Sequence, residues 1–449
     1  MRKLVFSVTI VAMTGIVLVS NNAIAEVMPS NAEIMREVTT LKEIIERQNM
    51  RIMELEKRVV REEEVNIRQS ETMDTRTATL ERLRGVREAF EGLEIGVSGT
   101  FVGQGTPDAN SVGDEQHKSR FDGSYSADLT IEKQFGDYGT AFAYLEAGQG
   151  GGLTDKLSVF SNVNYDATAG NNTAEWLEFW YQQYLFDRQV MLTAGKLDPT
   201  CFIDTNEYAN DECTQFLSDI FRNAPTVEFP ENAFGGRIYL TSEFLLNCIE
   251  VEAVYMDSGA TGWDDIMNKG FVGTQVNFMP ARAFGYDEER WGGNYRAYFW
   301  ANGADHLKIE DLEERTKEKN YGLGISCDQM LTEIFGAFGR FGWANPKVYV
   351  GDNNSGIEYT WSMGLQMTGE YWNREEDIVA VGVGQVIPGE DYRDTVDTHK
   401  NETHLEAYYS YKVNDHLTMS PDFQVIWDPN GDGNERYLFI YGIRGQVDY

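Results

Sequence analysis

The C-terminal segment alternates in character at every position. From Tyr437 to Tyr449 the odd positions are apolar or small, while Arg444, Gln446 and Asp448 occupy even positions. A period of two places alternate side chains on opposite faces of a strand. The segment therefore predicts a strand with an aromatic outer face and a polar inner face, on which the arginine would need water.

The same alternation recurs from residue 93 onward and predicts sixteen strands. Apolar residues from Leu405 to Val413, for example, alternate with Glu406 and Lys412. The predicted strands span 93–103, 121–133, 139–148, 174–185, 189–198, 233–241, 246–257, 270–279, 291–301, 321–328, 331–343, 357–369, 376–387, 402–413, 416–427 and 437–449.

The connections between these strands alternate between short turns and long loops. The long loops are rich in Asp, Asn, Gly and Thr, and span 104–120, 149–173, 199–232, 302–320 and 388–401. An up-and-down barrel has this alternation when one rim carries the external loops. Apolar residues outside and charges inside predict a water-filled lumen, since a soluble barrel has a packed core. A soluble β-sandwich is the alternative, although its connections would not sort by length.

The N-terminal residues 1–25 have the features of a cleaved secretory signal. An apolar run from Leu4 to Val19 follows two basic residues, and a small-residue cleavage motif ends at Ala25. A membrane anchor is the alternative interpretation. No later stretch approaches the ~20 apolar residues of a spanning helix, so a membrane protein with this sequence would have to be a barrel.

Residues 33–83 contain no Gly, Pro or Trp and follow a helical period. Apolar residues recur at the spacing of a heptad, at Ile34, Val38, Leu41, Ile45, Ile52, Leu55 and Val59. This pattern predicts an α-helical coiled coil within a domain spanning 26–85, with the barrel domain spanning 93–449. A helix that folds back on its own domain is the alternative. Val and Ile at one core position with Leu at the other favour two strands.

The chain of 449 residues has a formal net charge of -34 and a pI near 4.5. Such a chain is not expected to bind nucleic acid, which requires clustered Lys and Arg. We expect no enzyme, because the sequence has no nucleophile elbow, phosphate loop or HExxH motif.

Several segments of the barrel domain resemble the carbohydrate-selective porin (OprB) family. They are 195–198, 202–211, 214–217, 223–225, 335–343, 381–384 and 402–409, in the order expected for the family. The resemblance covers roughly 93–449 and implies a sixteen-stranded outer-membrane barrel that passes sugars, notably monosaccharides such as glucose. It also implies the outer membrane of a Gram-negative-type bacterium, with outer-membrane lipid, small sugars and ions as partners.

The N-terminal coiled coil departs from the shortest members of that family. It resembles the periplasmic helical extensions of some envelope porins, which implies a homo-oligomer or a contact with the cell wall. Because porins are commonly three-fold, a trimer is favoured over the dimer that the core residues suggest.

The loop 199–232 is the predicted constriction, because one inward-folded loop narrows such barrels. Hydrogen-bonding side chains must replace the hydration of a sugar without holding it tightly. In the loop these are Asp204, Asn206, Asn210 and Asp211. On the walls they are Lys196, Arg237, Arg296, Arg340, Glu178 and Glu250. The alternatives are turn capping for the loop residues and ordinary solvated charge for the wall residues.

Two further features have a predicted structural role. Cys201 and Cys213 fall in the same loop of an exported chain, and a disulfide between them is expected. Asp428, Asn430 and Asp432 match the start of a calcium loop, but the bidentate glutamate is missing. A hairpin turn explains them better, with loosely bound Ca²⁺ as the alternative and no other cofactor expected.

The sequence thus predicts facilitated diffusion of small carbohydrates through a lumen narrowed by a loop. One alternative is a general, cation-preferring porin with the same fold. In the other, the barrel is an anchor and the coiled coil tethers the outer membrane to the cell wall.

Overall fold

The computed structural model describes residues 30–111, 117–166, 171–259, 266–311, 315–350, 356–396, 400–434 and 437–449. The chain divides into two units, Met1–Ala89 and Phe90–Tyr449. The predicted signal segment 1–25 lies outside the described residues.

Most of the described part of the first unit is one helix, α1 (Asn31–Phe90). This confirms the predicted helix. Its seam residues Val38, Leu41, Ile45, Ile52, Leu55 and Val59 are all at least half exposed. Among the described residues, no helix combines the length and the apolar character needed to cross a membrane.

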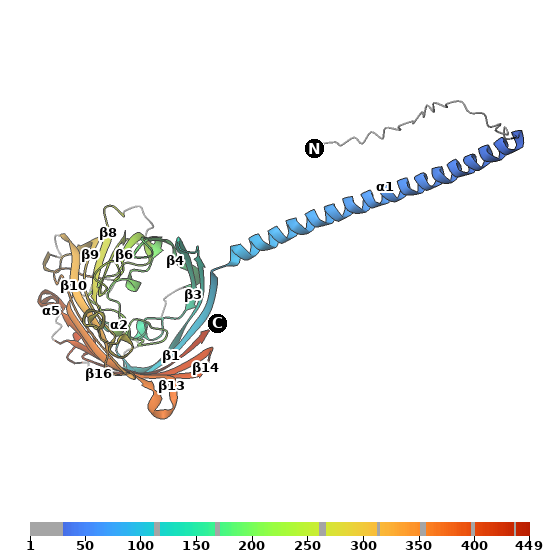
Figure 1. Cartoon of the computed structure of the whole chain (residues 1–449). Helices are drawn as coiled ribbons and strands as arrows, with labels where there is room; N and C mark the ends of the chain where they lie inside the picture. The colour runs from blue at the N-terminus through green and yellow to red at the C-terminus, as the bar shows by residue number, and fades with distance from the viewer. Residues whose placement is uncertain are drawn as a thin grey trace. The chain divides into compact units, whose positions relative to one another are not determined.

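The second unit is a closed antiparallel barrel of sixteen strands, as predicted (Figure 1). β1 pairs with β2 on one side and with β16 on the other, which closes the sheet. The strands are β1 (Leu93–Ala109), β2 (Lys118–Gln134), β3 (Gly139–Gln149), β4 (Asn171–Leu185), β5 (Val190–Leu197), β6 (Ala233–Leu240), β7 (Ile249–Asp257), β8 (Gly270–Phe278), β9 (Gly293–Leu307), β10 (Lys317–Met330), β11 (Phe335–Ala344), β12 (Ile357–Gly369), β13 (Arg374–Pro388), β14 (Glu402–Asn414), β15 (Leu417–Trp427) and β16 (Tyr437–Asp448).

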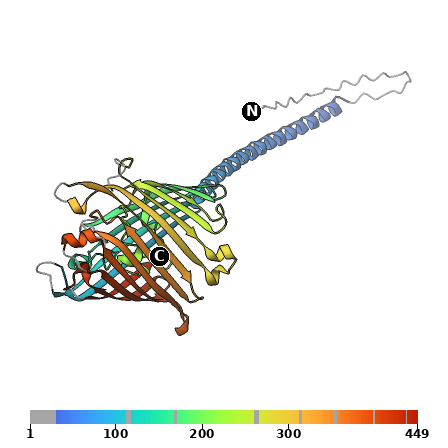
Figure 2. The same cartoon turned by 90° about the vertical axis from the view of Figure 1, so that its left-hand side faces the viewer.

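Short helices occur only in the connections of the barrel's described residues. They are η1 (Thr154–Lys156), η2 (Pro199–Cys201), α2 (Asp219–Arg222), α3 (Pro280–Phe284), α4 (Glu288–Trp291), η3 (Ile309–Asp311), η4 (Glu370–Trp372), α5 (Glu390–Val396) and η5 (Pro429–Gly431). Figure 2 shows the strands from the side, between the connections at the two rims. Two expected loops are shorter than predicted, because β1 and β2 extend into 104–120 from its two ends, and β9 and β10 extend into 302–320 in the same way.

The two faces of the strands differ as the alternation predicts. In β16 the outward Tyr441 is 52% exposed, whereas the inward Ile440 is fully buried. Arg444 is only 1% exposed, so it lies against protein and not against the water that we expected around it. Part of the inner wall is therefore covered from inside.

Two long connections fold into the barrel and provide this cover. We call 198–232 the constriction loop and the described residues 150–166 the companion loop; α2 marks the constriction loop inside the ring of strands in Figure 1. Their apolar side chains form three buried clusters with the inner wall. Ile203 of the constriction loop packs with Trp300 of β9, and Phe216 packs with Tyr408 of β14.

Candidate functional site

Arg340 of β11 fixes the constriction loop to the inner wall of the barrel. Its guanidinium donates to the carbonyl oxygens of Phe221 (2.6 Å), Asp204 (3.0 Å) and Ala209 (2.5 Å). It also pairs with the Asp204 carboxylate at 3.3 Å, and Asp204 Oδ2 accepts from the amide of Ala224 at 2.6 Å. Both side chains of this ion pair are buried. Together they hold four separate positions of the loop, 204, 209, 221 and 224, at one point of the wall.

Two further wall residues hold the middle of the loop by its backbone. Arg444 of β16 donates to the carbonyl oxygens of Glu212 and Gln215, both at 2.7 Å. Glu406 of β14 accepts from the amides of 217–218 at 2.6 and 3.0 Å. Arginines meet carbonyl groups and a carboxylate meets amides, so each charge stabilises the end of the peptide group with the opposite partial charge.

The companion loop is attached to neighbouring strands in the same way. Glu402 of β14 accepts from the backbone amides of 160–161 at 2.8 to 3.0 Å. The amides of Gln104 (β1) and Gln424 (β15) both donate to the carbonyl oxygen of Val163, at 3.0 and 2.9 Å. The loop therefore lies along the wall where β1 and β14 to β16 meet.

Arg222 of α2 connects the two loops. Its guanidinium pairs with Glu212 of the constriction loop and donates to Asn223 Oδ1 at 2.7 Å. It also lies over the ring of Tyr165 in the companion loop, 4.0 Å from the ring centroid. A cation over an aromatic face is attractive, so the two loops support each other.

On the opposite wall, charged residues occur as pairs. Arg237 of β6 pairs with Glu252 of β7 and also donates to Gln182 Oε1 at 3.1 Å. Arg296 of β9 pairs with Asp328 of β10. Each of these arginines thus lies beside a carboxylate on the neighbouring strand.

Aromatic rings lie among these polar groups on the inner wall. Phe142 of β3 and Trp180 of β4 stack with ring centroids 5.0 Å apart, and the indole of Trp180 donates to Glu178 at 3.0 Å. Glu250 of β7 accepts from the amide of Asn277 at 3.1 Å. The wall thus combines ring faces with hydrogen-bonding groups.

The predicted loop residues Asp204 and Asn206 have structural partners. Asp204 is engaged with Arg340, as described above. The side-chain amide of Asn206 donates to Ser326 Oγ and to the carbonyl oxygen of Cys327, both at 3.1 Å. Both side chains are buried, so they fix the loop to β10 and β11.

Asn210 and Asp211 also have partners within the protein. Asn210 Oδ1 accepts from Arg340 at 3.3 Å, while Asp211 Oδ1 accepts from the amide of Cys213 at 2.8 Å. Asp211 therefore caps a turn. A role of these loop residues in binding sugar stays a prediction.

Among the predicted wall residues, five point inward and Lys196 does not. Lys196 pairs in register with Phe179 and Phe234, two exposed outer-face positions. Its position close to the end of β5 lets the amine reach Glu175 Oε1 (3.2 Å) and the carbonyl oxygen of Trp176. A long stem lets a lysine cover apolar surface while its charge finds polar partners.

The expected disulfide is not formed: the structure describes Cys201 and Cys213 as free thiols. The two cysteines have different neighbours. Cys201 Sγ lies 3.7 Å from Asp198 Oδ2, and Cys213 Sγ accepts from Thr100 Oγ1 at 3.4 Å.

The segment with Asp428, Asn430 and Asp432 forms a turn between β15 and β16. The amide of Asn430 donates to Glu402 Oε2 at 2.6 Å, so the turn is tied to the wall. Within the described residues, no three His, Cys, Asp or Glu side chains are grouped as metal ligands. Loosely bound Ca²⁺ at this turn stays a prediction.

Sequence reasoning missed three residues of this site: Arg222, Glu402 and Tyr208, the last of which lines the cavity described below. The alternation in β14 could have identified Glu402, because this residue lies on the same inward face as Glu406. Arg222 and Tyr208 lie in a loop without a period, so the sequence does not indicate where their side chains point.

Both inner loops are expected to pack more firmly at low pH. Burial raises the pKa of Asp166 in the companion loop and of Asp219 in α2 to about 7 each. Between their ordinary pKa near 3.8 and about 7, the folded loops hold protons that the unfolded chain loses, so the free energy of loop ordering becomes less favourable as pH rises through this window. The protection factors of the backbone amides in both loops, measured by hydrogen exchange, should therefore be higher at pH 5 than at pH 8. The variant Asp166→Asn/Asp219→Asn should lose most of this difference, and an unchanged difference would contradict the assignment.

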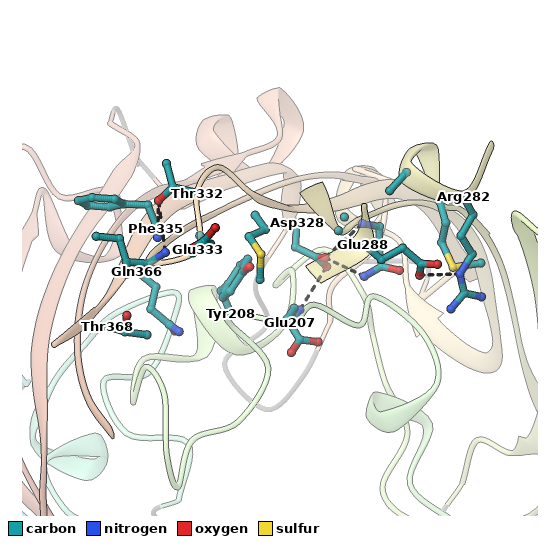
Figure 3. A pocket seen from close by; sticks show the side chains of 18 residues that line it. Glu207, Tyr208, Arg282, Glu288, Asp328, Thr332, Glu333, Phe335, Gln366 and Thr368 are labelled. Carbon is teal, nitrogen blue, oxygen red and sulfur yellow. Dashed lines mark hydrogen bonds and ion pairs between the residues drawn. The ribbon is translucent and has the colours of Figure 1, made fainter. Parts of the chain in front are cut away.

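A cavity of about 440 Å³ lies between the constriction loop and the short-turn end of β8 to β12 (Figure 3). We call it the vestibule. Glu207 and Tyr208 reach it from the constriction loop, and Asp328, Glu333 and Gln366 from the wall and its turns. A second cavity of about 250 Å³ shares Glu207, Tyr208 and Gln366 with it. The space on this side of the loop therefore continues toward β16.

The profile of the family described as "Carbohydrate-selective porin, OprB family" matches residues 115–449. A curated protein of Aquifex aeolicus (strain VF5), described as uncharacterized, is 26% identical over 256 residues, which make up 57% of this chain and 63% of that protein. The match thus spans less than two thirds of that relative's length.

Solved porin structures share the fold. The high-pH structure of Pseudomonas putida OprB matches with a TM-score of 0.66 and 15% identity, over 82% of this chain and 97% of that one. The low-pH structure of the same protein matches with a TM-score of 0.50 and 13% identity, over 82% and 96% of the two chains.

Proposed function

Because the chain belongs to the carbohydrate-selective porin family OprB, we propose that it lets small sugars, notably monosaccharides such as glucose, diffuse across the outer membrane. The family and the closed sixteen-stranded barrel indicate a channel protein of that membrane. Passage through such a channel needs groups that replace the hydration of a sugar and release it again.

The observation that carries the proposal is the pair of loops held inside the barrel. Arg340, Arg444, Glu402 and Glu406 bind loop backbone from the wall, which narrows the lumen with a fixed structure. The stacked rings of Phe142 and Trp180 offer an apolar face beside carboxylates and amides, which suits the C–H face and the hydroxyl groups of a pyranose.

Single-channel conductance tests this function. Glucose is titrated into a planar bilayer that contains the protein, with a potassium chloride gradient across it. We expect millimolar glucose to reduce the current in a saturable way, because a bound sugar occupies the narrowed lumen. Unchanged current would refute the sugar function.

One observation favours the alternative of a general, cation-preferring porin. Asp128 and Glu146 are direct cross-strand partners on the inner wall, and the hydroxyl of Tyr144 lies 3.0 and 3.3 Å from their carboxylates. Neither carboxylate has an ion pair within the described residues. The hydroxyl of Ser98 also donates to Asp128, at 3.2 Å. The two carboxylates thus have hydroxyl donors but no cationic partner among the described residues, so this place would attract a cation. A strongly cation-selective reversal potential without glucose block would establish this alternative.

We also propose that α1 assembles copies of the protein, as a trimer, through its apolar seam. The exposed residues repeat every three and four positions, which is the spacing that a coiled coil buries. A contact of this helix with the cell wall is the second use that we propose for it.

A further inference from the structure

The ring of Tyr208 is held against the wall of the vestibule by the shape of β11. A Cβ atom at Gly336 would lie 2.3 Å from this ring, so only glycine leaves room for it. The amide of Tyr208 donates to Asn206 Oδ1 at 3.1 Å, and Asn206 is itself fixed to β10. The ring is therefore positioned in advance, while its hydroxyl has no hydrogen bond within the described part of the chain.

Several polar groups around this ring lack partners. Figure 3 shows Glu207, Glu333 and Gln366 around the cavity with Tyr208. Neither Glu207 nor Glu333 forms an ion pair among the described residues, and the side-chain oxygens of Gln366 and Thr368 have no hydrogen-bond partner there.

The other two carboxylates of the vestibule are already neutralised. Asp328 pairs with Arg296, and Glu288 pairs with Arg282 at 2.7 Å. The vestibule therefore keeps an excess of negative charge from Glu207 and Glu333, with acceptor oxygens in surplus over donors.

We propose that the vestibule is a second sugar subsite, on the short-turn side of the constriction loop, that takes neutral or cationic monosaccharides and rejects anionic ones. This inference rests on the proposed sugar transport. Its volume lies within the ~300–1,000 Å³ of ordinary ligand pockets. A monosaccharide supplies hydroxyl donors to the carboxylates and to Gln366, and the ring of Tyr208 packs against its C–H face.

The same charges explain the discrimination. A sugar that carries a carboxylate, such as glucuronate, would bring a third negative charge beside Glu207 and Glu333, and nearby like charges repel. The hydroxyl groups of glucuronate would form no more hydrogen bonds than those of glucose, so they would not offset this repulsion. The subsite thus separates two sugars of nearly equal size by charge alone.

The experiment uses the full-length protein inserted in one orientation, with sugar added on the short-turn side. For Gln366→Ala we expect the glucose concentration for half-maximal block to rise about threefold or more, as one hydrogen bond is lost. For Glu207→Gln/Glu333→Gln we expect glucuronate permeability relative to glucose to rise about threefold at low salt. Glu370→Gln is the matched control: it removes an exposed carboxylate from the β12–β13 turn, outside the lining of the vestibule, and should change neither value.

The outcomes separate this proposal from the transport function. If glucose blocks the wild-type channel but both vestibule variants behave like the control, the subsite is refuted and the porin function stands. If glucose never blocks the wild-type channel from either side, the sugar function itself fails. Circular dichroism of each variant, matched to the wild type, shows that the barrel is folded.

Discussion

Replacing Arg340 with methionine is expected to release the constriction loop from the wall and to open the channel. Three carbonyl oxygens and the Asp204 carboxylate would lose their common partner. Removal of one member of a buried ion pair costs about 3–5 kcal/mol, because the other charge is left buried without compensation. The single-channel conductance should rise roughly twofold or more, and glucose block should weaken, since the lumen widens where the loop had crossed it.

Two further variants show whether the released charge is the cause. In Asp204→Leu/Arg340→Met both charges are gone, so part of the lost stability should return. Arg188→Met is the control, because this exposed arginine lies in the β4–β5 turn and contacts neither inner loop. A conductance of Arg340→Met equal to that of the control would show that the loop does not depend on this anchor.

Deleting residues 26–85 is expected to abolish the oligomer and to leave a folded barrel. The barrel unit closes its own sheet, so it does not require the helix for its fold. The mass of the detergent-solubilised protein, corrected for detergent by analytical ultracentrifugation, should fall from a trimer to one chain. If transport persists while the outer membrane detaches from the cell wall in cells, the helix also acts as the tether.

Point substitutions make the same prediction without truncation. Ile45→Asp/Ile52→Asp puts charges into the seam, where each side chain would otherwise gain about 1.5–3 kcal/mol on burial. Met50→Asp is the matched control, because Met50 is an exposed apolar residue of the same helix outside the repeating seam positions. A trimer that survives the seam variant would show that the barrel walls hold the copies together, and a wild-type dimer would correct the number of strands.

The fold could be predicted from the sequence because its signals are local. A strand alternates in character within a few residues, and β12 begins and ends where the pattern predicts. The inward direction of Arg340 followed from the same alternation. Its partners did not, because they lie in a loop more than a hundred residues earlier in the chain, and no period indicates how that loop folds.

Lys196 illustrates the opposite limit. A charged residue in a barrel strand is expected to face water inside, yet Lys196 lies on the outer face between two phenylalanines in register. The position near the end of the strand makes this tolerable, since the amine reaches Glu175 and the backbone at Trp176. The disulfide prediction met a similar limit, because closeness in sequence did not bring the two thiols together.

The placement of the loop anchors also has a consequence for assembly. The constriction loop is synthesised before β11, β14 and β16, which carry Arg340, Glu406 and Arg444. Contacts between segments so distant in sequence form late, because the chain between them must be ordered first. The constriction loop is therefore fully anchored only when the last strands have joined the sheet. A barrel that lacks these strands would let solutes pass without selecting among them.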